Sequence, residues 1–276
     1  MPGAFALEGV MKPDLEPIIR QQPQEDLVII PVYDLHVGSE QFDKEAWETF
    51  VQKVREDPAV AIVIGGDCLD NGIKSSVTLP YEQTMRPREQ KAYLAETLEP
   101  IKSKIFCGVS GNHEQRSTKE TDDNPLFDVF CKLDIEDRYR ENGAFLFLTF
   151  GERKMESGTD SDGKRRPYYC IMVHHGTGGG MYIGSQTYRQ ERFGNIIDGL
   201  DILITGHTHK PITFPAAKLV CDPRNKKVSV KEFRCVTANS WLNYGGYPLR
   251  KMLAPASRTM TEIRLCGTRK EIRVTQ

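Results

Sequence analysis

The sequence contains no long hydrophobic run. Its longest apolar stretches, such as residues 145–150, fall far short of the ~20 residues that a membrane-spanning helix requires. The first 26 residues contain four prolines and no basic segment followed by an apolar one, so they lack the pattern of a signal peptide. We therefore expect a cytoplasmic protein without a membrane segment, and a flexible N-terminal arm over residues 1–26.

Paired cysteines and an excess of one charge are also missing. The seven cysteines are odd in number, widely scattered and without a Cys-x-x-Cys pair, which predicts reduced core residues rather than disulfides. The formal net charge of −1 gives no overall attraction to phosphate polymers. Two basic clusters, within residues 153–166 and 224–227, are mixed with glycine or small polar residues, and we interpret both as solvated hairpin tips.

Apolar runs that alternate with helix-period segments indicate an α/β fold. In the first half we expect strands over residues 27–32, 60–64 and 105–109, and helices over residues 43–55 and from Pro87 to Ile101. The second half is richer in strands: an antiparallel pair over 144–150 and 168–173, a helix over 185–198, and strands over 202–204, 227–236, 260–265 and 271–274. Without a repeat or a linker, residues 27–276 are predicted to form a single domain.

The chain has only six histidines, and each of them follows a predicted strand. Carboxylates and an amide accompany them at the same places. The strand-end residues are Asp34, His36, Asp67, Asp70, Asn112, His113, His174, His175, His207 and His209. In open α/β sheets the crevice beyond the carboxyl ends of the strands binds ligands, so we expect these loops to converge on one site.

The residue types indicate what this site holds. Imidazole, carboxylate and amide ligands without thiolates suit Mn²⁺, Fe²⁺, Zn²⁺ or Ni²⁺. Two carboxylates, one amide and four histidines exceed the ligand set of one tetrahedral ion, which indicates two ions. The spacings Asp-x-His and His-x-His fit this hypothesis, because alternate residues that leave a strand project to one side.

Five segments resemble the ordered motifs of the calcineurin-like metallophosphoesterase superfamily. They are DLH at 34–36, GGDCLDN at 65–71, GNHE at 111–114, HHG at 174–176 and GHTH at 206–209. Each segment alone is a weak signal, but the five in this order, each after a strand, are highly specific. The resemblance implies a four-layer fold, with two mixed β-sheets packed face to face and flanked by helices, and a dinuclear metal site at the sheet edge.

The resemblance also implies a role for each matching residue. Asp34, His36 and His209 correspond to ligands of a first ion, Asp67 to the carboxylate that bridges both ions, and Asn112, His207 and one of His174 and His175 to ligands of the second. We favour His175 because it precedes Gly176, and His174 stays open. His113 corresponds to a histidine that faces the leaving group, and Asp70 to an acidic residue that orients it and favours its protonated form.

These roles predict an enzyme that hydrolyses phosphoesters with two divalent ions, Mn²⁺ being favoured. A hydroxide that bridges the ions would attack phosphorus, since metal binding lowers the pKa of water from 15.7 to about 7. The segment Asp70-Asn71-Gly72 lacks the arginine that related protein phosphatases carry there. We therefore expect a phosphodiesterase that acts on a nucleotide or nucleic-acid-like diester. The alternatives are a phosphomonoesterase and a non-catalytic scaffold that binds a protein; the sequence predicts no oligomeric state.

Overall fold

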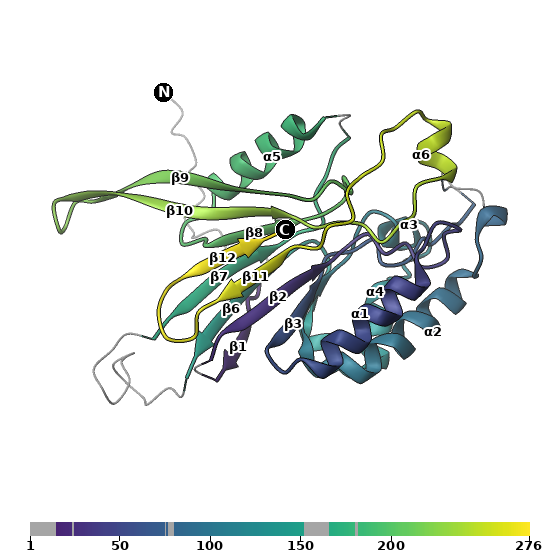
Figure 1. The fold of residues 1–276 in the computed structure, drawn as a ribbon, viewed down its shortest axis with the longest axis horizontal. Helices are drawn as coiled ribbons and strands as arrows, with labels where there is room; N and C mark the ends of the chain where they lie inside the picture. Colours follow the sequence, from purple (N-terminus) through teal and green to yellow (C-terminus); the bar gives the residue numbers. More distant parts are fainter. Residues whose placement is uncertain (1–14, 24, 75, 77–79, 152–165, 180–181) are drawn as a thin grey trace, which may run out of the picture.

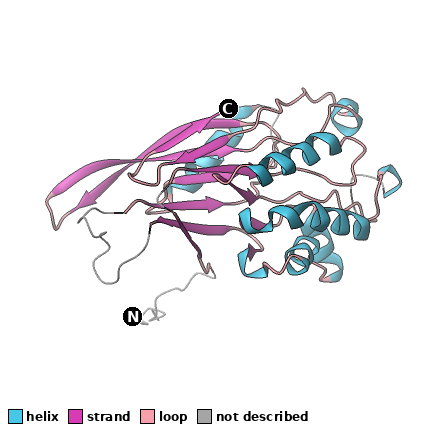
Figure 2. Cartoon of the chain, turned by 60° about the horizontal axis from the view of Figure 1, so that its bottom comes forward, coloured by secondary structure: helices cyan, strands magenta, loops and turns pink. Residues whose placement is uncertain are grey.

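The chain folds into two six-stranded sheets with helices on their outer faces (Figures 1 and 2). The computed structural model describes residues 15–23, 25–74, 76, 80–151, 166–179 and 182–276. Among these residues no helix has the length and apolar composition to cross a membrane.

The first sheet has the strand order β12-β11-β2-β3-β4-β5. The strands β2 to β5 pair in parallel, whereas β11 runs antiparallel to both β2 and β12. Their bounds are β2 Leu27–Val32, β3 Val60–Ile64, β4 Ile105–Val109, β5 Tyr139–Arg140, β11 Glu262–Leu265 and β12 Ile272–Thr275. The carboxyl ends of β2, β3 and β4 therefore lie at one edge of this sheet.

The second sheet has the strand order β1-β6-β7-β8-β10-β9. Here β7 runs parallel to β8 and β8 parallel to β10, so that the carboxyl ends of β7 and β8 also share an edge. The bounds are β1 Ile18–Gln22, β6 Ala144–Phe150, β7 Tyr168–Val173, β8 Ile202–Thr205, β9 Ile212–Asp222 and β10 Lys227–Thr237. The long hairpin of β9 and β10 extends beyond the rest of the molecule in Figure 1.

Alternate residues of the central strands divide between two apolar layers. Leu27 and Ile29 of β2 pack in the layer between the sheets, together with Ile171 of β7 and Ile202 of β8. The intervening residues Val28, Ile30 and Val32 pack on the other side, against the helices. All six residues of β2 are buried, and this explains why the strand is a continuous apolar run rather than an alternating one.

Helices complete the outer layers. The helices α1 (Lys44–Glu56), α2 (Pro87–Leu98) and α4 (Pro125–Lys132) cover the first sheet, and α5 (Ile183–Asn195) covers the second. In α1 the Asp43 side chain accepts a hydrogen bond from the amide of Ala46, which caps the helix, and the buried stripe contains Trp47 and Phe50. Two short helices, α3 (Glu114–Thr121) and α6 (Gly246–Arg250), lie near the ends of the strands.

The predicted four-layer α/β architecture is confirmed, and so are the expected strands and helices, with small shifts at their ends. Six strands and α-helices were not predicted: β1, β5, β9, α3, α4 and α6. The strand β9 contains Pro215 and is mostly half-buried or exposed, a composition that is possible because β9 lies at the sheet edge. The helices α3 and α4 are eight residues each, too short for a clear helical period.

The expectation of a loose arm over residues 1–26 is wrong for Ile18–Gln22. This segment forms β1, which pairs in parallel with β6 and buries Ile18. An edge strand with one buried apolar residue carries little pattern of its own, and its pairing partner lies more than 120 positions away. Residues 1–14 of the expected arm, and the basic cluster before Arg166, lie outside the described residues.

All seven cysteines are free, as expected, but not all of them lie in the core. Cys131 and Cys221 are exposed and Cys266 is half-buried, whereas the other four are buried. The basic residues Arg224, Lys226 and Lys227 lie at the turn between β9 and β10, which confirms that they form a hairpin tip.

Gly108, in the middle of β4, allows α4 to approach the first sheet. A β-carbon at this position would lie 2.2 Å from the Phe130 ring. We expect Gly108→Ala to lower the free energy of unfolding by ~1–3 kcal/mol, the usual cost of overpacking a core, measured by urea denaturation.

Gly184→Ala in α5 is the matched control, because a β-carbon there meets no atom within 4 Å. It should leave stability unchanged or raise it by about 0.5–1 kcal/mol. If Phe130 is the obstacle, Phe130→Leu should cost less stability in the Gly108→Ala background than in the wild type. Additive effects of the two substitutions would contradict this explanation.

Candidate metal centre

The loops that follow β2, β3, β4, β7 and β8 meet at one place. Main-chain hydrogen bonds connect them: the amide of His36 donates to the carbonyl of Asp67 at 2.9 Å, and the amide of Gly206 donates to the carbonyl of His175 at 2.8 Å. The amide of His207 donates to Oδ2 of Asp34 at 2.9 Å and so joins a loop of one sheet to a loop of the other. The predicted convergence of these loops is thus observed, and the site lies across the edges of both sheets.

The backbone turns sharply at the predicted ligands. Asp34, His36, Asp67, His207 and His209 all have positive φ angles, between 49° and 68°. This left-handed conformation costs an L-residue roughly 1–2 kcal/mol, and strain of this kind is concentrated at functional sites. These left-handed turns direct the side chains at the strand ends into a common space.

A first cluster consists of Asp34, His36 and His209. Nε2 of His36 lies 3.2 Å from Nε2 of His209, and Nε2 of His209 lies 3.5 Å from Oδ1 of Asp34. Ligands held ~2.0–2.2 Å from one ion are separated by about this distance. Oδ1 of Asp34 is buried and has no hydrogen-bond donor among the described residues, so this cluster contains an unsatisfied anionic atom that fits a cation.

A second cluster consists of Asp67, His175 and His207, with Asn112 beside them. Nε2 of His175 lies 3.3 Å from Oδ2 of Asp67, 3.3 Å from Nδ1 of His207 and 3.1 Å from Oδ1 of Asn112. The other ring nitrogen of His175 donates to the carbonyl of Gly65 at 2.8 Å, which leaves Nε2 free to bind an ion. The donor set of this cluster also fits a divalent transition ion.

Asp67 connects the two clusters. Its Oδ1 accepts the amide of His113 at 2.8 Å, whereas Oδ2 lies 3.3 Å from Nε2 of His175 and 4.0 Å from Nε2 of His36. One carboxylate oxygen thus faces ligands of both clusters, and the buried His/Asp clusters are consistent with a dinuclear metal site. Gly111 packs directly against the Asp67 carboxylate, and no larger residue would fit at this position. A β-carbon there would lie 2.1 Å from Oδ1 of Asp67.

Of the two adjacent histidines, the structure brings His175 into the second cluster and leaves His174 outside the clusters. Nδ1 of His174 accepts the amide of Gly176 at 2.8 Å, and its ring lies beside Phe193 of α5. Successive residues after a strand point to opposite sides, so only one of the pair can reach the metal centre.

His113 lies beside the centre, with Nε2 3.8 Å from Oδ2 of Asp67. Its Nδ1 donates to the main-chain carbonyl of Asp70 at 2.8 Å, while the Asp70 carboxylate lies 3.5 Å from this nitrogen and 3.6 Å from Nδ1 of His36. Asp70 therefore positions His113 mainly through its main chain, and its carboxylate faces two imidazoles rather than one.

Asp70 raises the pKa of His113, which is the direction expected from the sequence, but this effect is not the largest one on the histidine. Burial and the neighbouring His36 lower the pKa of His113 to about 4, and they outweigh the opposite effect of Asp67 and Asp70. A proton on Nε2 of His113 at neutral pH therefore requires additional negative charge nearby, such as that of a bound phosphoester.

Negative charge is concentrated at the bottom of the site. Burial raises the pKa of Asp67, but the surrounding imidazoles, His175 first, lower it well below its usual range. Burial lowers the pKa of His175, but the combined attraction of Asp67, Asp34 and the Gly65 carbonyl raises it to about 10. Protons and metal ions thus compete for Nε2 of His175, as expected of a histidine that faces carboxylates.

Glu114 is a functional residue whose role the sequence did not reveal. It is fully buried, and its carboxylate accepts the amides of Asp67 and Gly111, both at 2.9 Å, and that of Leu69 at 3.0 Å. It therefore holds the loops after β3 and β4 together behind Asp67. The signal was present in the GNHE segment, but only the fold shows that its glutamate points inward.

The clusters open into a cavity of about 460 Å³. Arg116 of α3 lines this cavity, and so do Asn243 and the ion pair of Arg250 with Glu82. Among the described residues Arg116 makes only long hydrogen bonds, of 3.4 Å to the carbonyl of Asp70 and 3.5 Å to Oγ of Ser76. Its guanidinium is thus available to an anion that reaches the metal centre.

Comparison with known proteins agrees with this geometry. Over 146 residues the chain is 28% identical to the DNA polymerase II small subunit of Thermoplasma acidophilum, a region that makes up 50% of this chain and 28% of that protein. The chain thus spans less than a third of that relative's length. Residues 34–211 match the Calcineurin-like phosphoesterase family, and this match includes all five strand-end segments. The protein belongs to the calcineurin-like phosphoesterase family.

Proposed function

We propose that the protein is a metal-dependent phosphodiesterase that acts on a nucleotide or a nucleic-acid-like diester. The observation that carries this proposal is the pair of His/Asp clusters that share Asp67 and open, beside His113, into one cavity. The family match supports phosphoester hydrolysis in general. The similarity to a DNA polymerase subunit supports a nucleotide or nucleic-acid diester as the substrate class.

Each predicted ligand has a place in this proposal. Asp34, His36 and His209 would hold one ion, Asn112, His175 and His207 would hold the other, and Asp67 would serve both. Bound ions of this kind, for which Mn²⁺ is our first choice and Fe, Zn or Ni the alternatives, supply an activated water and positive charge for the phosphoryl oxygens. Glu114 and the Gly65 carbonyl fix the orientation of the ligands from behind.

His113 is proposed to protonate the leaving oxygen. The hydrogen bond from Nδ1 to the Asp70 carbonyl fixes the ring, so that Nε2 faces the cavity side of Asp67. The negative charge of the bound ester favours the protonated form of His113, whose Nε2 would donate the proton to the leaving oxygen. Asp70, which contacts His113 and His36, is a positioning residue in this scheme.

Two features favour a diester over a monoester. The position after Asp70 carries Asn71, whose side chain is buried and donates to the His113 carbonyl and to Ser117, so it offers no cation to a second phosphate charge. Of the two arginines in the cavity, Arg250 already pairs with Glu82, and Arg116 alone faces the substrate without an ion pair among the described residues. A monoanionic diester needs fewer cations than a dianionic monoester.

The substrate class is tested with two nitrophenyl esters in the presence of Mn²⁺. We expect a higher kcat/KM for bis-p-nitrophenyl phosphate than for p-nitrophenyl phosphate, because the described cavity offers one available guanidinium. A preference for the monoester would overturn the diester assignment and support the phosphomonoesterase alternative.

The role of His113 is tested by His113→Ala. This substitution should leave both ions bound but slow the hydrolysis of esters with poor leaving groups by ~10²- to 10⁴-fold, since these need the proton most. Nitrophenyl esters, whose leaving groups are stable anions, should be slowed far less. Equal slowing of both kinds of ester would contradict the role of His113 as an acid.

The shared carboxylate is tested by Asp67→Asn. Because Oδ2 of Asp67 faces both clusters, this variant should bind fewer ions at both positions, measured by elemental analysis of protein purified with Mn²⁺. Asp137→Asn, at an exposed carboxylate outside the cavity, is the control and should bind the same two ions as the wild type. Wild-type protein without bound metal would instead support the scaffold alternative.

A further inference from the structure

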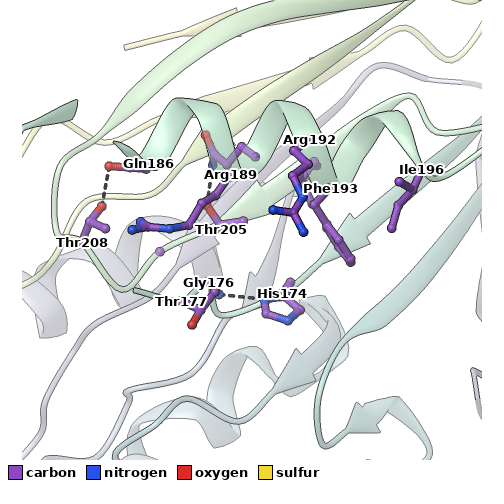
Figure 3. A pocket seen from close by; sticks show the side chains of 13 residues that line it. His174, Gly176, Thr177, Gln186, Arg189, Arg192, Phe193, Ile196, Thr205 and Thr208 are labelled. Atoms are coloured by element: carbon purple, nitrogen blue, oxygen red, sulfur yellow. Dashed lines mark hydrogen bonds between the residues drawn. The ribbon is translucent and has the colours of Figure 1, made fainter. Parts of the chain in front are cut away.

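A second cavity, of about 450 Å³, lies beneath α5 (Figure 3). His174, Gly206 and Thr208 line it, and in each case the next residue along the chain belongs to a metal cluster. The second cavity therefore shares its wall with the metal centre but does not include any of the proposed ligands. Its volume lies in the range of small-molecule sites, roughly 300–1,000 Å³.

The charge of this cavity is positive. Arg189 and Arg192 line it, one helical turn apart on α5, and no carboxylate is among the described residues that line it. In Figure 3 both guanidinium groups lie on the side of α5 that faces His174 and Thr177. An anion would enter this space without opposing charge, in contrast to the metal centre with its aspartates.

Polar atoms in the second cavity are also unsatisfied. Nη2 of Arg189 donates to the carbonyl of Gly179 at 3.0 Å, but Nη1 is buried and has no hydrogen-bond partner among the described residues. Oε1 of Gln190 is likewise buried without a partner. The amide nitrogen of Gln190 lies within hydrogen-bond distance of the Val236 carbonyl and of the hydroxyls of Thr205 and Thr237. Nη1 of Arg189 and Oε1 of Gln190 are both enclosed by protein atoms, so each would have to move to reach a ligand in the cavity.

The remaining wall is apolar. Phe193, Ile196 and Leu203 line the cavity, and the Phe193 ring lies with its centroid 5.7 Å from that of His174. Aromatic faces of this kind favour a planar ring, while paired guanidinium groups favour a phosphate. The cavity thus combines an apolar, aromatic wall with two guanidinium groups, and its volume fits a small molecule.

From these contacts we propose that the second cavity binds a small organic phosphate that carries a planar ring and is no larger than a nucleoside monophosphate. The phosphate contacts Arg189 and Arg192, and the ring lies against Phe193. This proposal does not depend on the hydrolytic activity proposed above, because no metal ligand contacts this ligand.

The test uses phenylphosphonate, a stable mimic that phosphoester hydrolysis cannot cleave, and methylphosphonate, which has the same anionic group without the ring. Binding to the full chain loaded with Mn²⁺ is measured by calorimetry. We expect phenylphosphonate to bind at least about tenfold more tightly than methylphosphonate, and Arg192→Gln to weaken phenylphosphonate binding at least about tenfold. Arg192 makes no hydrogen bond or ion pair among the described residues, so the variant should fold normally.

Arg55→Gln, at an exposed arginine of α1, is the matched control and should bind phenylphosphonate like the wild type. Ile196→Asp is a second variant: this side chain is 74% exposed at the cavity rim, and a carboxylate there should repel the ligand. Phenylphosphonate held only by the metal centre would bind equally to Arg192→Gln and Arg55→Gln. Such equality, or equal affinity for the two phosphonates, would overturn the proposal.

Discussion

The position of the Asp67 carboxylate is the constraint on which the rest of the site depends. One of its oxygens is held by the amide of His113, and the other is left between two groups of imidazoles. Glu114 holds the amide of Asp67 from behind, and Gly111 leaves room for the carboxylate. The loops after β3 and β4 are therefore arranged around a single acidic side chain, and the histidines from the other strands are placed with respect to it.

This arrangement is unfavourable for the fold taken alone. Five predicted ligands have left-handed backbone conformations, and two aspartates are buried almost completely. Buried carboxylates cost free energy unless cations or donors compensate for them. The two apolar layers, one between the sheets and one beneath α1, α2 and α4, supply the stability that tolerates this cost.

Sequence patterns predicted the site well because its signals are local. Each ligand follows an apolar strand, and in parallel strands the carboxyl ends meet at one edge. The convergence of Asp34 with Asp67 in one sheet, and of His175 with His207 in the other, therefore needed no knowledge of long-range packing. Elements with weak local signals were not predicted. The strand β1 acquires its structure from β6, and the helix α4 depends on the contact of Phe130 with Gly108.

Other parts of the site depend on contacts between residues far apart in the chain. Sequence patterns did not predict them for that reason. The role of Glu114 depends on three amides from two loops, and the low pKa of His113 depends on its burial beside His36. The second cavity exists only because α5 lies over the loops after β7 and β8. None of these relations has a period or a spacing that could be recognised along the chain.

The predicted ligands of the first cluster come from two different sheets, and this has a mechanical consequence. Asp34 and His36 leave one sheet, whereas His209, which completes their cluster, leaves the other. Any sliding of one sheet past the other would separate these atoms by the same amount. A cation bound among them would link the two sheets directly. The relative position of the sheets and the geometry of the metal site would then depend on the same ion.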